Sequence, residues 1–285
     1  MNRRRVVITG LGCVTALSES VDELFTALCE GKSGVSTIES FDTSQYPVHF
    51  GGEIKHFDVS QYVDKREAKR MDRFTQFAIA GAINAVKDSG LDFAKEDPYR
   101  VGVIVGTGIG GIKEIEEQHV RLIEKGPGKV SPFCVPRLMS NAASGNIAIQ
   151  FGARGPCFAV SSACASGNHT IGEAFCNIAS NRSDVVITGG SEAALTPIGL
   201  GSFCAARSLS LRNDNPPIAS RPFDRDRDGF VLTEGAGILV LEEFERARKR
   251  GATIYAELLG YGATDDGYHI TAPLPNGEGA AMAMR

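Results

Sequence analysis

One cysteine has surroundings that suit a nucleophile. Cys164 lies where a serine-rich segment leads into an amphipathic run, within residues 160–175. Ser161 and Ser162 are good N-cap candidates, and apolar residues recur after them at the three-and-four spacing of a helix with one buried face. We therefore expect Cys164 in the first helical turn, where unpaired backbone N–H groups and the helix dipole favour the thiolate. An acyl group on this sulfur would be a thioester, and the same N–H groups could hold an oxyanion.

The residues beside Cys164 are all small, which leaves room for a substrate to approach the sulfur. They are Ser162, Ala163, Ala165, Ser166 and Gly167. Cysteines in general pack more often than they react, and the other six lack this combination. We interpret those six as core or incidental residues: Cys13, Cys29, Cys134, Cys157, Cys176 and Cys204.

A base for the cysteine is harder to find, although cysteine nucleophiles usually act with a histidine. His169 follows Cys164 by five residues, about 140° around a helix, so we expect it to point elsewhere. His269 lies in a specialised stretch, residues 265–273, but ordering a turn would explain it equally well. His49, His56 and His119 are expected to be exposed. Without a candidate His–Asn or His–Asp set, a cysteine hydrolase ranks low.

Composition limits the class of protein. The chain has 285 residues, 42% hydrophobic and 22% charged, which is ordinary for one large or two medium globular domains. Its seven cysteines include no C-x-x-C pair and no metal-ligand spacing, so we expect no disulfide framework, no metal and a reducing, cytoplasmic location. A net charge of −4 argues against nucleic-acid binding. No apolar run reaches the ~18 residues that a membrane span needs.

The order of elements predicts an α/β fold. Apolar β-branched runs predict strands at 5–10, 101–105, 184–188 and 236–241. Helical spacing predicts helices at 21–30, 72–89, 112–125 and 242–250, besides the one after Cys164. Because the strands do not alternate polar and apolar residues, the sheet should be covered on both faces. Gly10 and Gly12 predict a tight turn after the first strand.

A glycine-rich segment invites a different interpretation. Residues 106–111 satisfy the G-x-G-x-x-G dinucleotide pattern between a strand and a helix. That pattern also needs an acidic residue on a second strand about 20 residues later, and here the region is a glutamate-rich helix. We therefore rank nicotinamide or flavin binding low and expect these glycines to let the backbone pass close to another element or to an acyl chain.

Several segments together resemble a known family, the elongating type II β-ketoacyl-acyl carrier protein synthases of the thiolase-like fold. The segments are residues 4–12, residues 105–111, Ser162-Ala-Cys-Ala-Ser-Gly167, Phe203-Cys-Ala-Ala-Arg-Ser-Leu-Ser210, residues 220–231 and Tyr268-His-Ile-Thr-Ala-Pro273. The resemblance covers essentially the whole chain. One departure is Thr233, where the family typically has glycine.

The resemblance implies a thiolase-like layered fold in which helices cover a mixed β-sheet. It implies an N-terminal ketosynthase domain at 1–258 and the start of a C-terminal half at 259–285, most of which is missing. The family's two histidines and lysine, which serve decarboxylation and condensation, lie in motifs that do not occur here. We therefore expect a truncated chain or one chain of a split enzyme, with this part of the site absent.

The implied reaction is a decarboxylative Claisen condensation in fatty acid elongation, with Cys164 carrying the acyl group and malonyl-acyl carrier protein supplying the extender. By family position, Ile109 and Phe203 line the acyl pocket, and Arg207 and Thr271 lie near the phosphopantetheine route. No metal or redox cofactor is implied, because substrates arrive on the phosphopantetheine of acyl carrier protein. A homodimer is implied as well.

A basic stretch at 64–73 would by itself be a solvated helix face. Since carrier proteins are acidic, the resemblance instead assigns Lys65, Arg66, Lys69 and Arg70 to carrier docking. Two alternatives stay open: a catalytically incomplete subunit that binds a carrier protein or dimerises, and a ketosynthase of polyketide synthesis.

Overall fold

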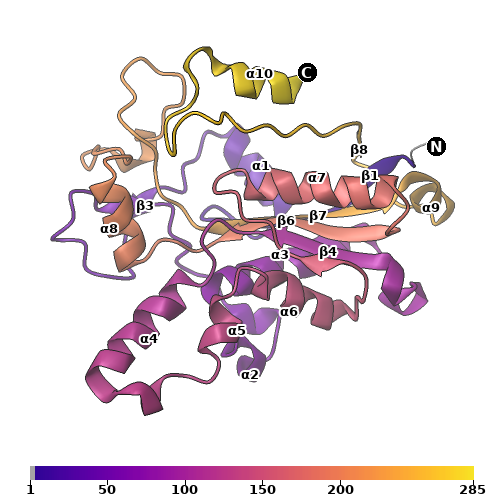
Figure 1. Ribbon diagram of the computed structural model, residues 1–285, viewed down its shortest axis with the longest axis horizontal. Coiled ribbons are helices and arrows are strands. Elements are labelled where there is room, and N and C mark those ends of the chain that lie inside the picture. The colour runs from indigo at the N-terminus through magenta and orange to yellow at the C-terminus, as the bar shows by residue number, and fades with distance from the viewer. Residues whose placement is uncertain (1–3) are drawn as a thin grey trace.

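The computed structural model describes residues 4–285 and centres on a six-stranded sheet (Figure 1). The strand order is β5-β4-β6-β7-β1-β8; β5, β4 and β6 are parallel, and the other neighbours are antiparallel. The strands are β1 (Val6–Val14), β4 (Val101–Gly106), β5 (Cys157–Phe158), β6 (Val185–Glu192), β7 (Gly235–Glu243) and β8 (Ala256–Leu258). A separate ribbon pairs β2 (Ser36–Thr37) with β3 (Phe50–Gly51). The predicted α/β class with a mixed sheet is confirmed.

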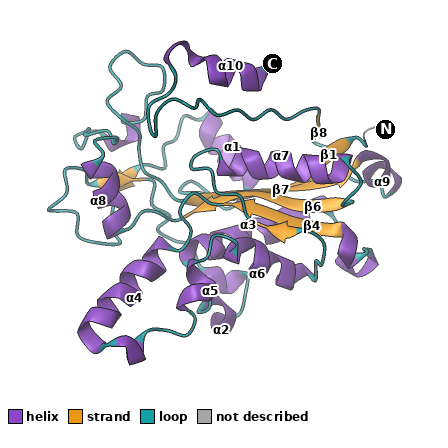
Figure 2. Ribbon diagram, in the orientation of Figure 1, coloured by secondary structure: helices purple, strands orange, loops and turns teal. Residues whose placement is uncertain are grey.

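Helices cover both faces of this sheet, as Figures 1 and 2 show. The helix α3 lies on β1 and β7 and packs beside α6, whereas α7 lies on β4 and β6 from the other side. The helices are α1 (Val21–Cys29), α2 (Lys65–Ala68), α3 (Arg73–Ser89), α4 (Ile112–Lys125), α5 (Cys134–Leu138), α6 (Ala142–Phe151), α7 (Ser166–Ala179), α8 (Pro197–Ala205), α9 (Phe244–Lys249) and α10 (Glu278–Met284).

Successive residues of the central strands belong to two different cores. In β4, Val103 and Val105 pack in the cluster under α3, and Ile104 packs in the cluster under α7. In β6, Ile187 packs in the cluster under α3, and Val186 packs in the cluster under α7. Because side chains alternate across a strand, a strand buried on both faces needs apolar residues at every position. This requirement is why these strands appear in the sequence as continuous β-branched runs.

The helix α3 begins and ends at clear signals. Asp72 caps its N-terminus by accepting a hydrogen bond from the backbone N–H of Phe74. Gly90 ends it with φ +63°, a left-handed conformation that suits glycine. The prediction of a helix over 72–89 is confirmed to within a residue.

The prediction of a tight turn at Gly10 and Gly12 is wrong, since both glycines lie inside β1, which continues to Val14. Their role is to let α3 come close. A Cβ on Gly10 would lie 2.2 Å from the carbonyl oxygen of Ala85, and one on Gly12 would lie 2.0 Å from that of Gly81. Spacing in the sequence cannot separate the two roles, because a glycine signals either a turn or a close approach.

Among residues 4–285, no helix is both long enough and apolar enough to cross a membrane. The division between residues 258 and 259 stays a prediction; in the structure β8 ends at Leu258, and the chain beyond it passes over α7 to reach α10 (Figure 1).

Candidate active site

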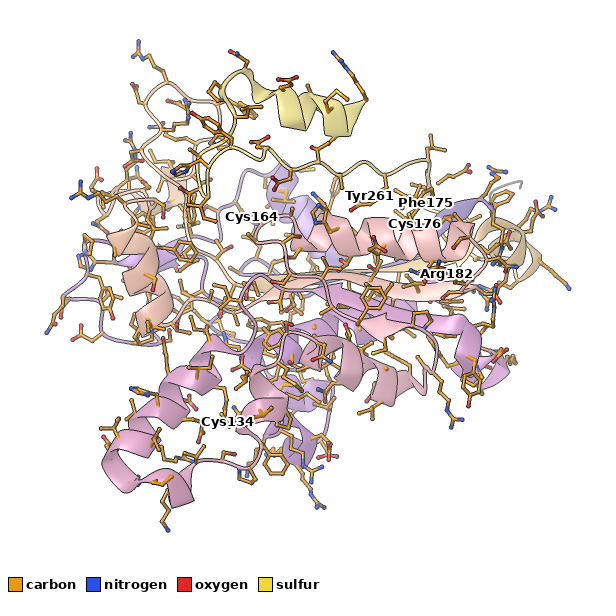
Figure 3. The ribbon with its side chains drawn as sticks, viewed as in Figure 1. Cys134, Cys164, Phe175, Cys176, Arg182 and Tyr261 are labelled. Carbon is orange, nitrogen blue, oxygen red and sulfur yellow. The ribbon has the colours of Figure 1, made fainter. Side chains whose placement is uncertain are left out.

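Cys164 lies in a turn at the N-terminal end of α7 (Figure 3), and its side chain is exposed. The expected place in the first helical turn is wrong, because α7 begins two residues later, at Ser166. Ser161 and Ser162 do not cap it either; the cap position is Ala165, and no side chain caps the helix. The N-terminus of α7 thus has no side-chain cap next to the residue that carries the thiol.

The helix starts late because Ala163 has φ +51°. This left-handed conformation cannot be continued as a right-handed helix, and for a residue with a side chain it costs about 1–3 kcal/mol. Such a conformation persists only where the surroundings impose it. Ala163 therefore marks the backbone before Cys164 as a position under local constraint.

Hydrogen bonds from Ser166 close this turn. Its backbone N–H and its Oγ both donate to the carbonyl oxygen of Ala163, at 3.1 and 2.7 Å. The same Oγ accepts the backbone N–H of Ser162 at 2.9 Å. The N–H of Ala165 donates to the carbonyl of Ser162 at 3.1 Å. Cys164 is thus the exposed corner of a turn whose other residues are bonded to one another.

His169 was predicted to point away from Cys164, and in the structure it is bonded to another residue of this turn, Ser162. Its Nδ1 lies 2.6 Å from Oγ of Ser162, and the two groups share a hydrogen bond. The helical angle was sound relative to Cys164 itself, since the described residues give the Cys164 thiol no hydrogen-bond partner. The late start of α7 leaves Ser162 folded back over the first turn, where His169 reaches it.

The glycine-rich segment 106–111 lies against the same turn. A Cβ on Gly106 would be 2.8 Å from the carbonyl oxygen of Ser166, and Oγ of Ser161 donates to the carbonyl of Gly108 at 3.3 Å. A Cβ on Gly111 would be 2.6 Å from Cα of Leu138 in α5. The expectation that these glycines permit a close backbone approach is confirmed.

Glu192, at the end of β6, holds this glycine segment and was missed in the sequence. Its carboxylate accepts hydrogen bonds from Thr107 Oγ1 at 3.0 Å and from the N–H groups of Gly108 at 2.8 Å and Ile109 at 3.1 Å. Burial raises the pKa of this carboxyl, against the lowering effect of those donors. No cation pairs with it among residues 4–285. Glu192 therefore holds the glycine segment through hydrogen bonds from neutral donors and not through an ion pair.

The residues assigned to the acyl pocket and the phosphopantetheine route fall in three places. Ile109 is 43% exposed in the glycine segment beside the Cys164 turn. Phe203, on α8, packs edge-on against Phe230 at 5.4 Å, and Arg207 follows it with φ +53°. Thr271 is exposed and lines a cavity of about 760 Å³ between α7 and residues 258–283, as does His169. That these residues contact a substrate stays a prediction.

His269, the other histidine considered, orders its own loop. Its Nδ1 accepts the backbone N–H groups of Thr271 at 3.2 Å and Ala272 at 3.0 Å. This contact agrees with the interpretation of His269 as a turn-ordering residue.

The basic segment forms α2 and the residues after it. Lys65, Arg66 and Lys69 are exposed and form no ion pair among the described residues. Arg70 is engaged: it pairs with Glu67 at 3.0 Å, and its guanidinium lies 5.4 Å from the centre of the Phe133 ring. Three of the four assigned residues thus present unpaired positive charge to solvent.

Comparison with known proteins identifies the family. The family model described as Beta-ketoacyl synthase, N-terminal domain, matches residues 3–247. The chain belongs to the β-ketoacyl synthase family.

Named β-ketoacyl synthase relatives align along the whole chain. The 3-oxoacyl-acyl-carrier-protein synthase 2 of Vibrio cholerae is 50% identical over 284 residues, which are 100% of this chain and 69% of the relative. The protein of the same name from Synechocystis sp. is 48% identical, again over 100% of this chain and 68% of the relative.

Solved structures of β-ketoacyl synthases agree in fold. A β-ketoacyl synthase from Burkholderia phymatum superposes with a TM-score of 0.89 at 33% identity, covering 99% of this chain and 70% of that one. The ishigamide ketosynthase/chain length factor gives a TM-score of 0.91 at 34% identity, covering 99% of this chain and 68% of that one. The thiolase-like ketosynthase fold that the resemblance implied is confirmed.

Proposed function

We propose that the protein is an elongating β-ketoacyl-acyl carrier protein synthase, an acyltransferase of fatty acid biosynthesis, with Cys164 as its nucleophile. The observation that supports this most directly is the exposed thiol of Cys164, at a left-handed turn before the uncapped N-terminus of α7. A helix N-terminus favours an anion beside it. The same location would stabilise the oxyanion that forms when an acyl carbonyl on Cys164 is attacked.

The reaction would take place in two transfers. The Cys164 thiolate attacks the acyl thioester of a carrier protein, the carbon–sulfur bond to the carrier breaks, and the carrier thiol leaves with a proton. Malonyl-carrier protein then loses CO₂, and the resulting carbanion attacks the acyl carbonyl on Cys164. The bond to Cys164 breaks, its thiolate is regenerated, and a β-ketoacyl-carrier protein longer by two carbons is released.

Substrates would arrive on the phosphopantetheine of an acidic acyl carrier protein, with no resident metal or redox cofactor. One structural neighbour is a type II polyketide ketosynthase in complex with its acyl-carrier protein. In this chain, Lys65, Arg66 and Lys69 offer unpaired positive charge for such a partner. Ile109 and Phe203 would face the acyl chain, with Arg207 and Thr271 near the phosphopantetheine.

A loading experiment tests the function. The purified chain is mixed with radiolabelled acyl-carrier protein, and the label is located by peptide mapping. We expect the label on Cys164 and none on a Cys164→Ala variant that unfolds at the same temperature. Label on another residue, or none on the wild-type chain, would contradict the proposal.

The second candidate is a catalytically incomplete subunit that binds a carrier protein or dimerises. It is favoured by one observation, since the Cys164 thiol has no hydrogen-bonded base among residues 4–285. The same experiment separates the two: carrier binding without transfer of label supports the incomplete subunit. The share of label released as β-ketoacyl product after malonyl-carrier protein is added then tests condensation.

We also propose a cytoplasmic homodimer formed through the β5 edge of the sheet. The strand β5 has two residues, both exposed, and pairs only with β4 among the described strands. Ile149, on the neighbouring α6, is 82% exposed. Open strand edges with apolar neighbours favour pairing with another chain. Sedimentation of a Phe158→Glu variant should show monomers, whereas Leu28→Glu, at an exposed apolar position on α1, which contacts β1, should stay dimeric.

A further inference from the structure

Two hydrogen bonds tie the turn at Cys164 to its surroundings: the N–H of His169 donates to the carbonyl of Ala165 at 2.9 Å, and Oγ of Ser161 donates to the carbonyl of Gly108 at 3.3 Å. The bonds from Ser166 to Ala163 and Ser162 lie within the turn or at the first residue of α7. They fix the shape of the turn, but the side of the turn that begins at Ser162 needs a further support to tie it to the body of the helix. Since Ala163 is held at φ +51°, relaxation of the turn would move the Cys164 sulfur away from the N–H end of α7.

The hydrogen bond between Ser162 and His169 supplies that support. Oγ of Ser162 lies 2.6 Å from Nδ1 of His169, which is the fourth residue of α7. A serine hydroxyl both donates and accepts, so this bond can form with either tautomer of the imidazole and also with imidazolium.

His169 is itself held from the other side. Its ring meets the ring of Tyr261 edge-on, with the centroids 6.2 Å apart. Tyr261 can lie there because residue 172, one turn along α7, is a glycine: a Cβ at that position would be 2.3 Å from the Tyr261 ring. Figure 3 shows Tyr261 over α7 and Cys164 at its end. The contacts run from Tyr261 through His169 and Ser162 to the turn.

We infer that His169 is a positioning residue, which acts through Ser162 to keep the Cys164 thiol at the N-terminus of α7. It touches neither the thiol nor a reacting atom. The inference rests on Cys164 being the nucleophile of the proposed function. Without this bond the hydroxyl of Ser162 loses its partner, the turn relaxes, and the sulfur moves away from the N-terminus of α7. Displacements of about 1 Å are enough to slow such chemistry by orders of magnitude.

Four variants of the full chain test the inference. His169→Phe keeps a ring against Tyr261 but removes the hydrogen bond, and His169→Asn restores a polar group near the position of Nδ1. Ser162→Ala removes only the hydroxyl. His119→Phe, on the exposed face of α4, is the matched control. The readout is the rate of iodoacetamide alkylation at Cys164 at neutral pH, divided by the rate at the exposed Cys29 of the same molecule.

We expect His169→Phe and Ser162→Ala each to lower this ratio about tenfold, and their combination to lower it no further, since both remove one bond. His169→Asn should recover most of the rate, and His119→Phe should match the wild type. A ratio within twofold of wild type in His169→Phe, or an asparagine variant as slow as the phenylalanine variant, would overturn the inference. If His169→Phe fails to fold, Ser162→Ala decides alone by the same criterion.

Alkylation and acyl transfer separate this inference from the proposed function. If the wild-type chain accepts no acyl group from any carrier protein but the variants still slow alkylation at Cys164, the function is wrong and the positioning role stands. If acyl transfer occurs and alkylation does not respond to the variants, the positioning role is wrong and the function stands.

Discussion

The helices α3 and α7 cover opposite faces of one sheet. Both meet a strand backbone closely, α7 where Ser166 lies against Gly106, but α7 also has a cover of its own, the segment that carries Tyr261. On the α3 side, a Cβ on Gly12 would lie 2.0 Å from the backbone carbonyl of Gly81. On the α7 side, a Cβ on Gly172 would lie 2.3 Å from the side chain of Tyr261, which is 37% exposed. The first neighbour cannot move without moving the helix, whereas the second can. The rigid face sets the fold, and the face with a movable cover carries Cys164.

The largest expected effect is on the rigid face. Gly12→Ala forces α3 away from β1 and should lower the free energy of unfolding by about 3 kcal/mol or more, the range of severe overpacking. Gly237→Ala in the neighbouring β7 is the control, because a Cβ there meets nothing within 4 Å. Urea unfolding measures both. Equal stability of the two variants would show that α3 can move to accommodate the added methyl group, as Tyr261 is expected to do on the α7 side.

The second largest effect is expected at an ion-pair cluster at the ends of the strands, where Asp184 pairs with Arg4 and Arg100. Hydrogen bonds from Arg100, against the effect of burial, and then those from Arg4 lower the pKa of Asp184 from its usual 3.8 to about 2. A lowered pKa stabilises the fold above the unfolded value, and this contribution is lost as the pH falls from about 4 to about 2. Asp184→Asn should lower stability by about 1–2 kcal/mol at pH 7, allowing for partial exposure.

The pH dependence supplies the check on that cluster. Urea midpoints of the wild type and of Asp184→Asn should converge as the pH is lowered through that interval. A difference that stays constant down to pH 2 would mean that the carboxylate charge is not the source of the stability.

On the movable face, Gly172→Ala should change the free energy of unfolding by less than about 1 kcal/mol, since alanine favours the helix while the Tyr261 ring is displaced. The displacement should appear as faster iodination of Tyr261, measured by peptide mapping against the exposed Tyr99. A loss of stability as large as that of Gly12→Ala would remove the distinction between the two faces.

The smallest effect concerns α2, the short helix that precedes α3. Lys69 is exposed and unpaired among the described residues, so Lys69→Glu should leave stability unchanged and weaken carrier-protein binding about three- to fivefold at low salt. The difference should shrink as the ionic strength rises. Arg70→Glu should cost stability as well, because Arg70 contacts Glu67 and Phe133. Unchanged carrier affinity at low salt would contradict the docking role.

Much of the sheet was predictable because burial on both faces imposes a pattern that few other structures share. Strands β4, β6 and β7 and helices α3 and α4 lie close to where the β-branched runs and the helical spacing placed them. The short helices α5 and α6 gave no such signal. Their helical spans of 5 and 10 residues leave little periodicity to detect.

The exposed position of Cys164 agrees with the small residues around it, which indicated room for an approach to the sulfur; its role as nucleophile stays a proposal. The supports of its turn were not predictable. The late start of α7 was hidden, since the conformation of Ala163 depends on bonds from Ser166 that spacing does not reveal. Glu192 was missed because its partners at 107–109 are more than 80 residues away in the chain. A polar residue ending an apolar strand was the available signal.

The left-handed backbone at Ala163 limits how this protein can be redesigned. A position with positive φ accepts glycine readily, and asparagine or aspartate tolerate it, but β-branched side chains are excluded. In a library randomised at position 163, most variants would therefore disrupt the turn, whatever their effect on the reactivity of the thiol. The reactivity of the Cys164 thiol is therefore easier to change by substituting the residues that surround the turn than by substituting Ala163.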